Sequence, residues 1–90
     1  MASYTIDVRP RARRSLRQLD PSVRKAIAQV IDGLAADPRP SGAAALVGRR
    51  PYLRVRSGDY RVIYSDDDGA RVVTVATVGH RREIYRTFDL

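Results

Sequence analysis

The sequence predicts a single α+β domain in which a two-helix hairpin packs on one face of a small antiparallel sheet. Three observations support this prediction: the length of 90 residues, apolar residues spaced three and four apart after Pro10, and a spacing of two after Pro51. A chain of this length builds one hydrophobic core, so we expect residues 1–90 to form one domain. The helices precede most of the strands, so they should cover one face of the sheet and leave the other face open.

The first third of the chain predicts one strand and two helices. Residues 4–8 alternate apolar and polar side chains, as a half-buried strand does. A short amphipathic helix begins at Pro10, and a second begins at Asp20-Pro21, where Asp20 should cap the free N–H groups of the first turn. The apolar residues of these elements are Tyr4, Ile6 and Val8, then Ala12, Leu16 and Leu19, then Val23, Ile27, Val30, Ile31 and Leu34.

Residues 38–51 predict a long connection, because proline, glycine, serine and alanine dominate them. Their two large apolar residues, Leu46 and Val47, are expected to anchor the connection to the core. Gly33, inside the second helix, costs about 1 kcal/mol relative to alanine, which suggests that another element packs closely over it.

Residues 53–64 predict a hairpin with two chemically different faces. Gly58-Asp59 suits a two-residue turn, which places Arg56 directly opposite Arg61. The alternation sends one set of side chains toward the helices: Leu53, Val55, Tyr60, Val62 and Tyr64. It sends another set outward: Arg54, Arg56, Arg61 and Ile63. Opposed like charges destabilise a sheet, so this pattern favours a cationic surface for phosphate, unless Asp59 or residues 66–68 neutralise it.

The last third of the chain predicts two more strands. After a break at residues 66–69, residues 71–78 are nearly all β-formers and predict the central strand of the sheet, which Gly79 should end. Residues 83–86 are expected to form a short edge strand.

Charge and composition narrow the function. The chain has 17 basic and 10 acidic residues, a net charge of +7, and all but one of the basic residues are arginines. An arginine-rich genome accounts for part of this excess but not for the net charge, so we expect a polyanionic partner. No cysteine and one histidine exclude a disulfide framework, a thiolate metal site and a multi-histidine zinc site, so we expect no metal and no cofactor. No apolar stretch suits a membrane span or a signal peptide, so we expect a cytoplasmic protein that does not insert into a membrane.

A second group of candidate residues follows the predicted central strand. Gly79 frees the backbone to turn, so the next side chains should project toward the arginines. The ordinary pKa of a histidine, about 6.5, suits proton transfer at neutral pH, although His80 could also be an ordinary surface residue. Tyr85 is either a half-buried edge residue or a platform on which a base stacks.

Taken together, these segments resemble the RelE/ParE toxins of bacterial type II toxin–antitoxin systems, and the RelE side of that superfamily in particular. The resemblance covers almost the whole chain. Its most specific parts are the run Arg56-Ser57-Gly58-Asp59-Tyr60-Arg61-Val62-Ile63-Tyr64 and the run Val78-Gly79-His80-Arg81 with Tyr85 four residues later. Further parts are the first strand, the helical hairpin and the loop Leu46-Val47-Gly48.

This resemblance implies an mRNA interferase, a ribosome-dependent endoribonuclease that cuts the messenger in the ribosomal A site without a metal. The 2′-hydroxyl attacks the adjacent phosphate, which leaves a 2′,3′-cyclic phosphate and a 5′-hydroxyl. By resemblance, Arg61 stabilises the phosphate, Arg81 serves the leaving group, Tyr85 orients the substrate and Arg54 replaces a family lysine. Arg56 and Arg82 are expected to bind RNA with them.

The general base is not matched, because Tyr52 replaces a second family lysine and arginine stays charged. His80 is our hypothesis for a substitute. The resemblance also implies a cognate RelB-like antitoxin, bound in a hetero-oligomer. Two alternatives stay open: a ParE-like inhibitor of DNA gyrase, and an inactive module that binds an antitoxin or nucleic acid.

Overall fold

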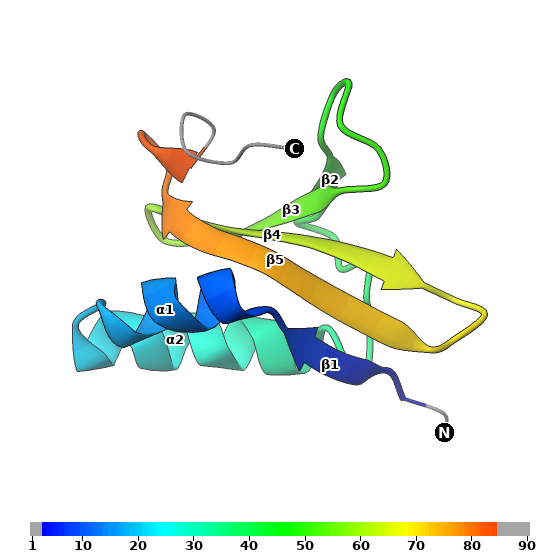
Figure 1. Cartoon of the computed structure of the whole chain (residues 1–90), viewed down its shortest axis with the longest axis horizontal. Helices are drawn as coiled ribbons and strands as arrows, with labels where there is room; N and C mark the ends of the chain where they lie inside the picture. Colours follow the sequence, from blue (N-terminus) through cyan, green and yellow to red (C-terminus); the bar gives the residue numbers. More distant parts are fainter. Residues whose placement is uncertain (1–2, 85–90) are drawn as a thin grey trace.

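A computed structural model describes residues 3–84 of the chain. The elements follow in the order β1 (Thr5–Val8), α1 (Pro10–Arg17), α2 (Pro21–Gly33), β2 (Ala44–Ala45), β3 (Leu53–Ser57), β4 (Tyr60–Asp67) and β5 (Val72–His80). The five strands form one sheet, and both helices lie on one side of it (Figure 1). The predicted α+β fold is therefore confirmed. In the described part of the chain, no helix is long and apolar enough to cross a membrane.

The sheet is mixed rather than wholly antiparallel. Its strand order is β1-β5-β4-β3-β2, so β4 lies at the centre, and the prediction that residues 71–78 form the central strand is wrong. β1 pairs in parallel with β5, which lies between β1 and β4, whereas the other three pairs are antiparallel. Parallel neighbours need a long connection, and here the chain between β1 and β5 includes both helices and three strands.

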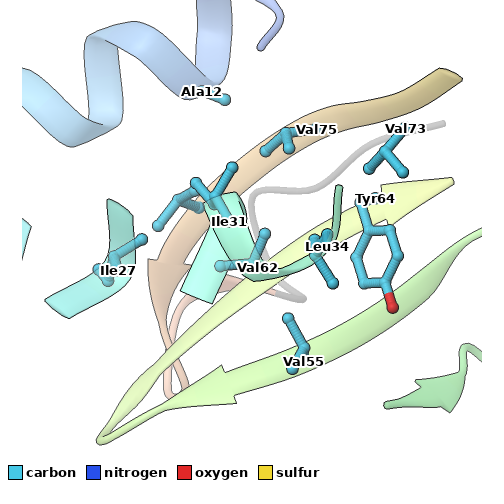
Figure 2. Packing of buried hydrophobic residues seen from close by; sticks show 10 residues of the cluster. Ala12, Ile27, Ile31, Leu34, Val55, Val62, Tyr64, Val73 and Val75 are labelled. Carbon is cyan, nitrogen blue, oxygen red and sulfur yellow. The ribbon is translucent and has the colours of Figure 1, made fainter. Parts of the chain in front are cut away.

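The main hydrophobic core lies between the helices and the sheet (Figure 2). Each element supplies the apolar positions that its periodicity predicts. The buried members are Ala12 from α1, Ile27 and Ile31 from α2, Leu34 after it, Val55 from β3, Val62 and Tyr64 from β4, and Val73, Val75 and Val78 from β5. Side chains of β1 and of the segment after α1 pack against them, Leu19 included, although α1 ends at Arg17.

The long connection differs from its prediction at two places. Ala44 and Ala45 form β2, which pairs with β3 at the edge of the sheet. Leu46 is half-buried against apolar neighbours, as expected, but 98% of Val47 is exposed. Val47 is therefore not an anchor to the core.

The helix ends also correct two expectations. Asp20 occupies the N-cap position of α2, but its side chain makes no capping hydrogen bond. A Cβ atom at Gly33 would meet nothing within 4 Å, so no element packs closely over this glycine. Gly33 is exposed at the last position of α2, which is where a residue of low helix propensity costs little.

The two breaks predicted after the hairpin are displaced along the chain. β4 continues to Asp67, so Asp66 belongs to the strand and not to the break. β5 continues through Gly79 to His80, and a turn follows it. Glu83 lies in this turn, so the predicted edge strand does not begin there; residues 85 and 86 of that prediction lie outside the described residues.

Polar contacts from β4 hold the start of the connection that follows α2. The Tyr64 hydroxyl donates a hydrogen bond to the carbonyl oxygen of Pro38 at 2.7 Å. Next to it, Nε of Arg39 lies 3.0 Å from Oδ2 of Asp66, whose side chain is only 4% exposed. Burial raises the pKa of Tyr64 to about 12, with the charge of Asp66 as a second cause.

This raised pKa predicts how stability depends on alkaline pH. In the unfolded chain, a tyrosine with an ordinary pKa near 10 loses its proton first, while Tyr64 in the folded protein keeps its own, so rising pH favours the unfolded state. The stability of the wild type relative to Tyr64→Phe should therefore shrink between pH 9 and pH 12, by at most about 1.4 kcal/mol per pH unit. Urea unfolding of both proteins across this range measures it, and parallel curves would contradict the assignment.

Candidate active site

The face of the sheet away from the helices carries three arginines from β3 and β4. Arg54 pairs with Ile63, and Arg56 pairs directly with Arg61, as the two-residue turn predicts. The flanking Val55 and Val62 face the helices, so alternation directs the arginines to the opposite side. We call the surface of Arg54, Arg56 and Arg61 the arginine face.

Arg61 is the most firmly held of the three. It is only 9% exposed, and its Nη1 donates to the carbonyl oxygens of Tyr60 at 3.1 Å and Gly58 at 3.4 Å. Gly58 belongs to the β3–β4 turn and Tyr60 is the first residue after it, so the turn that sets the register also helps to orient the guanidinium. A guanidinium has five N–H donors in a planar fork, and a carboxylate or phosphate can take two of them at once.

The acidic residues considered as neutralising partners lie elsewhere. Asp59 faces Arg81, and Asp66 pairs with Arg39. Asp68 accepts a hydrogen bond from the Tyr4 hydroxyl at 2.7 Å. Within residues 3–84, no carboxylate lies within ion-pair distance of Arg54, Arg56 or Arg61. The charge of the arginine face is therefore not compensated by the described part of the protein.

The arginine face is not open along its whole length, which corrects the prediction. Ile63 and Ile84 are buried on it as a second hydrophobic cluster. The half-buried members of this cluster are Leu46, Tyr52 and Ala76. Ile84 reaches the sheet because Gly79, which pairs with Arg61, has no side chain: a Cβ atom there would lie 2.9 Å from Cδ1 of Ile84. Apolar and cationic side chains therefore share this face.

Arg81 joins Arg61 at one end of the sheet. Its backbone N–H donates to the carbonyl oxygen of Asp59 at 2.7 Å, and its Nε lies 3.7 Å from a carboxylate oxygen of the same residue. The residue is exposed, so this ion pair is weak. Residues of the β3–β4 turn thus contact both arginines: Gly58 accepts a hydrogen bond from the side chain of Arg61, and Asp59 accepts one from the backbone of Arg81. Arg82 is also exposed.

His80 lies on the opposite face of the sheet. It pairs with Tyr60, and the two rings meet edge to face with centroids 5.5 Å apart. Together with Ser15, Gln18 and Leu19 from the helical hairpin, and with Glu83 and Ile84 after β5, these residues line a cleft of about 310 Å³ at this end of the sheet. The expectation that His80 turns toward the arginines is therefore wrong, because β5 continues one residue beyond Gly79 and alternation then directs His80 the other way.

The hydrogen bonding of His80 also bears on its proposed chemistry. Its Nδ1 accepts a hydrogen bond from the backbone N–H of Arg82 at 3.2 Å. In the neutral ring the proton then sits on Nε2, so neither nitrogen has a free lone pair. The described geometry does not favour His80 as a base.

The site that the described residues form is cationic. Arginines can bind a phosphate and stabilise the extra charge of a five-coordinate phosphorus, but they stay charged and do not accept a proton. Among residues 3–84, no group of three or more His, Cys, Asp or Glu side chains could hold a metal ion. Tyr85 lies outside the described residues. Sequence reasoning missed Ile84, and the one sequence signal was Gly79, a residue without a side chain at the end of a run of β-formers.

The packing of Ile84 on Gly79 predicts a specific double-mutant result. Gly79→Ala should destabilise the protein by about 1–3 kcal/mol, because buried Ile84 has no room to move away. Ile84→Val removes Cδ1, so the double variant should be less destabilised than the sum of the two single changes. Urea unfolding measures this, with Gly42→Ala as the control because nothing lies within 4 Å of it. Additive losses would show that the contact is not made.

The fold and its arginine face together define a class: the toxins of type II toxin–antitoxin systems. Residues 6–85 match the family described as "ParE toxin of type II toxin-antitoxin system, parDE". This match spans most of the chain. The protein belongs to this family, within the RelE/ParE superfamily.

Individual relatives lie on the RelE side of that superfamily. Toxin RelG of Mycobacterium tuberculosis (strain ATCC 25618 / H37Rv) is 32% identical over 84 residues, which are 92% of this chain and 97% of RelG. The toxin–antitoxin complex RelBE2 from M. tuberculosis has 30% identity and a TM-score of 0.75, and the match covers 88% of this chain and 99% of that one. For the intact E. coli RelBE complex the identity is 29% and the TM-score 0.74, with 86% and 95% of the two chains covered.

Proposed function

We propose that this toxin is a metal-independent endoribonuclease that cleaves messenger RNA in the ribosomal A site and so inhibits translation. The observation that carries the proposal is the uncompensated arginine face, with Arg81 held at the same turn as Arg61. A structural role alone does not account for Arg56 directly opposite Arg61, because opposed like charges cost stability. The names of the relatives on the RelE side are consistent with this activity.

The reaction assigns a role to each arginine. The substrate 2′-oxygen loses its proton to water and bonds to the adjacent phosphorus. The bond from phosphorus to the 5′-oxygen breaks, and this oxygen takes a proton from water to become the 5′-hydroxyl. Arg61, fixed by two carbonyl oxygens, stabilises the charge on the phosphate. Exposed Arg81 stabilises the negative 5′-oxygen through hydrogen bonding and charge rather than by giving up a proton. Arg54, Arg56 and Arg82 bind the RNA backbone.

Tyr85 completes the proposed site by orienting the nucleotide near its 2′-oxygen. It follows Ile84 in the chain, and Ile84 is buried against Ile63 on the arginine face.

We further propose that a RelB-like antitoxin binds this toxin in a hetero-oligomer in the cytoplasm. The solved complexes from M. tuberculosis, E. coli and other organisms pair related toxins with their antitoxins. A net charge of +7 suits an acidic partner.

A second candidate function is inhibition of DNA gyrase, as the ParE name of the matching family suggests. Such a toxin acts by binding a protein and has no use for a phosphate site. A reporter messenger translated with the purified toxin separates the two functions. Cuts within ribosome-occupied codons support the nuclease, whereas an intact messenger together with blocked supercoiling supports gyrase inhibition. If neither occurs, the protein is an inactive binding module.

Replacement of Arg61 tests the phosphate site. Arg61→Ala should lower the rate of messenger cleavage about 100-fold or more, because it removes the one buried cation of the face. Primer extension on a translated reporter measures the rate, and circular dichroism checks that the variant is folded. Arg17→Ala, at an exposed position of α1, is the matched control and should cleave at the parent rate. A folded, fully active Arg61→Ala would contradict the site.

Replacement of His80 tests which face is used. His80→Ala should cleave within about threefold of the parent rate from pH 6 to pH 8. The imidazole lies on the face of the sheet opposite the arginine face, next to Tyr60, and its Nδ1 accepts a backbone hydrogen bond. The same primer-extension assay, repeated at several pH values, measures this. A rate that falls about 100-fold, or that loses its pH dependence, would restore His80 as the base.

A further inference from the structure

The loop of residues 46–52, between β2 and β3, projects from the sheet on the side away from α1 and α2 (Figure 1). Near its start lies Val47, which is 98% exposed and is the one large hydrophobic side chain exposed to this degree among the described residues. A single exposed hydrophobic residue is ordinary on a protein surface. What distinguishes Val47 is the construction of the loop that presents it.

The loop is held in shape at both ends. The backbone N–H of Leu46 donates to the carbonyl oxygen of Tyr52 at 3.0 Å, that of Arg49 to Leu46 at 3.2 Å, and that of Tyr52 to Arg49 at 2.9 Å. Gly48 has a φ of 71°, a left-handed conformation that suits glycine. Leu46 and Tyr52 also pack into the second hydrophobic cluster with Ile63. Val47 therefore lies on a turn whose shape is fixed by backbone hydrogen bonds and by packing at both ends.

Two arginines follow Val47 and Gly48 in the loop and precede the strand that carries the arginine face. Arg49 and Arg50 are exposed, and within residues 3–84 no carboxylate lies within ion-pair distance of either. Beyond the loop, β3 carries Arg54 and Arg56 on the arginine face, about 7 Å apart along the strand. Residues 49–56 thus carry four arginines between the loop and the turn next to Arg61.

We infer that the loop of residues 46–52 is a second RNA-binding element, which holds the part of the messenger beside the scissile phosphate. Arg49 and Arg50 bind backbone phosphates, and Val47 contacts the apolar surface of an unstacked base or its ribose. The inference rests on the proposed function for its claim that RNA lies along the arginine face. An acidic protein segment would also suit the charges, but the continuation of the loop arginines into Arg54 and Arg56, beside the proposed phosphate site, favours nucleic acid.

A charge-matched pair of variants tests the inference. R49A/R50A and R14A/R17A each remove two exposed positive charges, the second pair from α1 on the other side of the sheet. In cleavage of a reporter messenger on programmed ribosomes, R49A/R50A should raise the half-saturating toxin concentration about tenfold and leave the maximal rate within about twofold. R14A/R17A should change both by less than about twofold. Val47→Ser should raise the half-saturating concentration about threefold.

Direct binding separates this inference from the proposed function. The full chain is titrated against a fluorescent single-stranded RNA of about 20 nucleotides at several salt concentrations. R49A/R50A should bind more weakly than R14A/R17A, and its salt slope should fall by about 1 to 2 relative to the parent. If the parent cleaves no messenger but this difference persists, the nuclease proposal fails and the loop remains an RNA contact. If the two pairs behave alike in both assays, or if R49A/R50A weakens only capture of the antitoxin, the inference is overturned.

Discussion

The pairing of β3 with β4 around Gly58-Asp59 is the constraint on which the rest of the structure depends. It sets Val55 opposite Val62 and Arg56 opposite Arg61. A shift by one residue would exchange the two faces and force arginines into the core between the helices and the sheet. The hydrophobic core therefore fixes the positions of the arginines, although they lie on the other side of the sheet.

The same turn links fold and site. The carbonyl oxygens of Gly58 in the turn and of the adjoining Tyr60 orient the guanidinium of Arg61. The carbonyl oxygen of Asp59 accepts a hydrogen bond from the backbone N–H of Arg81 as the chain leaves β5. Two arginines far apart in the sequence thus lie next to the same turn at one end of the sheet, Arg61 buried and Arg81 exposed. Across the hairpin, Arg56 directly opposes Arg61. The repulsion of this pair costs stability, and a phosphate bound on the arginine face would relieve it. We regard this stored repulsion as the physical sign of an anion site.

Local periodicity made much of the fold and of the arginine face predictable from the sequence. The apolar stripes, the hairpin register and the opposition of Arg56 to Arg61 all follow from spacings within a few residues. The side on which His80 lies could not be predicted in this way, because it depends on whether β5 ends at Gly79 or one residue later. Nor could the cover over the sheet, because Ile84 packs on Ile63, which is distant in sequence. Val47 was predicted to be an anchor because it is a large apolar residue in a connection dominated by small ones. Whether such a residue is buried depends on long-range contacts, which local periodicity does not show.

The central claim is that the arginine face cleaves RNA through the 2′-hydroxyl. The most direct measurement is the chemistry of the new ends, by mass spectrometry of a short messenger recovered from ribosomes that were incubated with the purified toxin. The account predicts a 2′,3′-cyclic phosphate on the upstream fragment and a free 5′-hydroxyl on the downstream fragment. An intact messenger, or fragments that end in a 3′-hydroxyl and a 5′-phosphate, would contradict it.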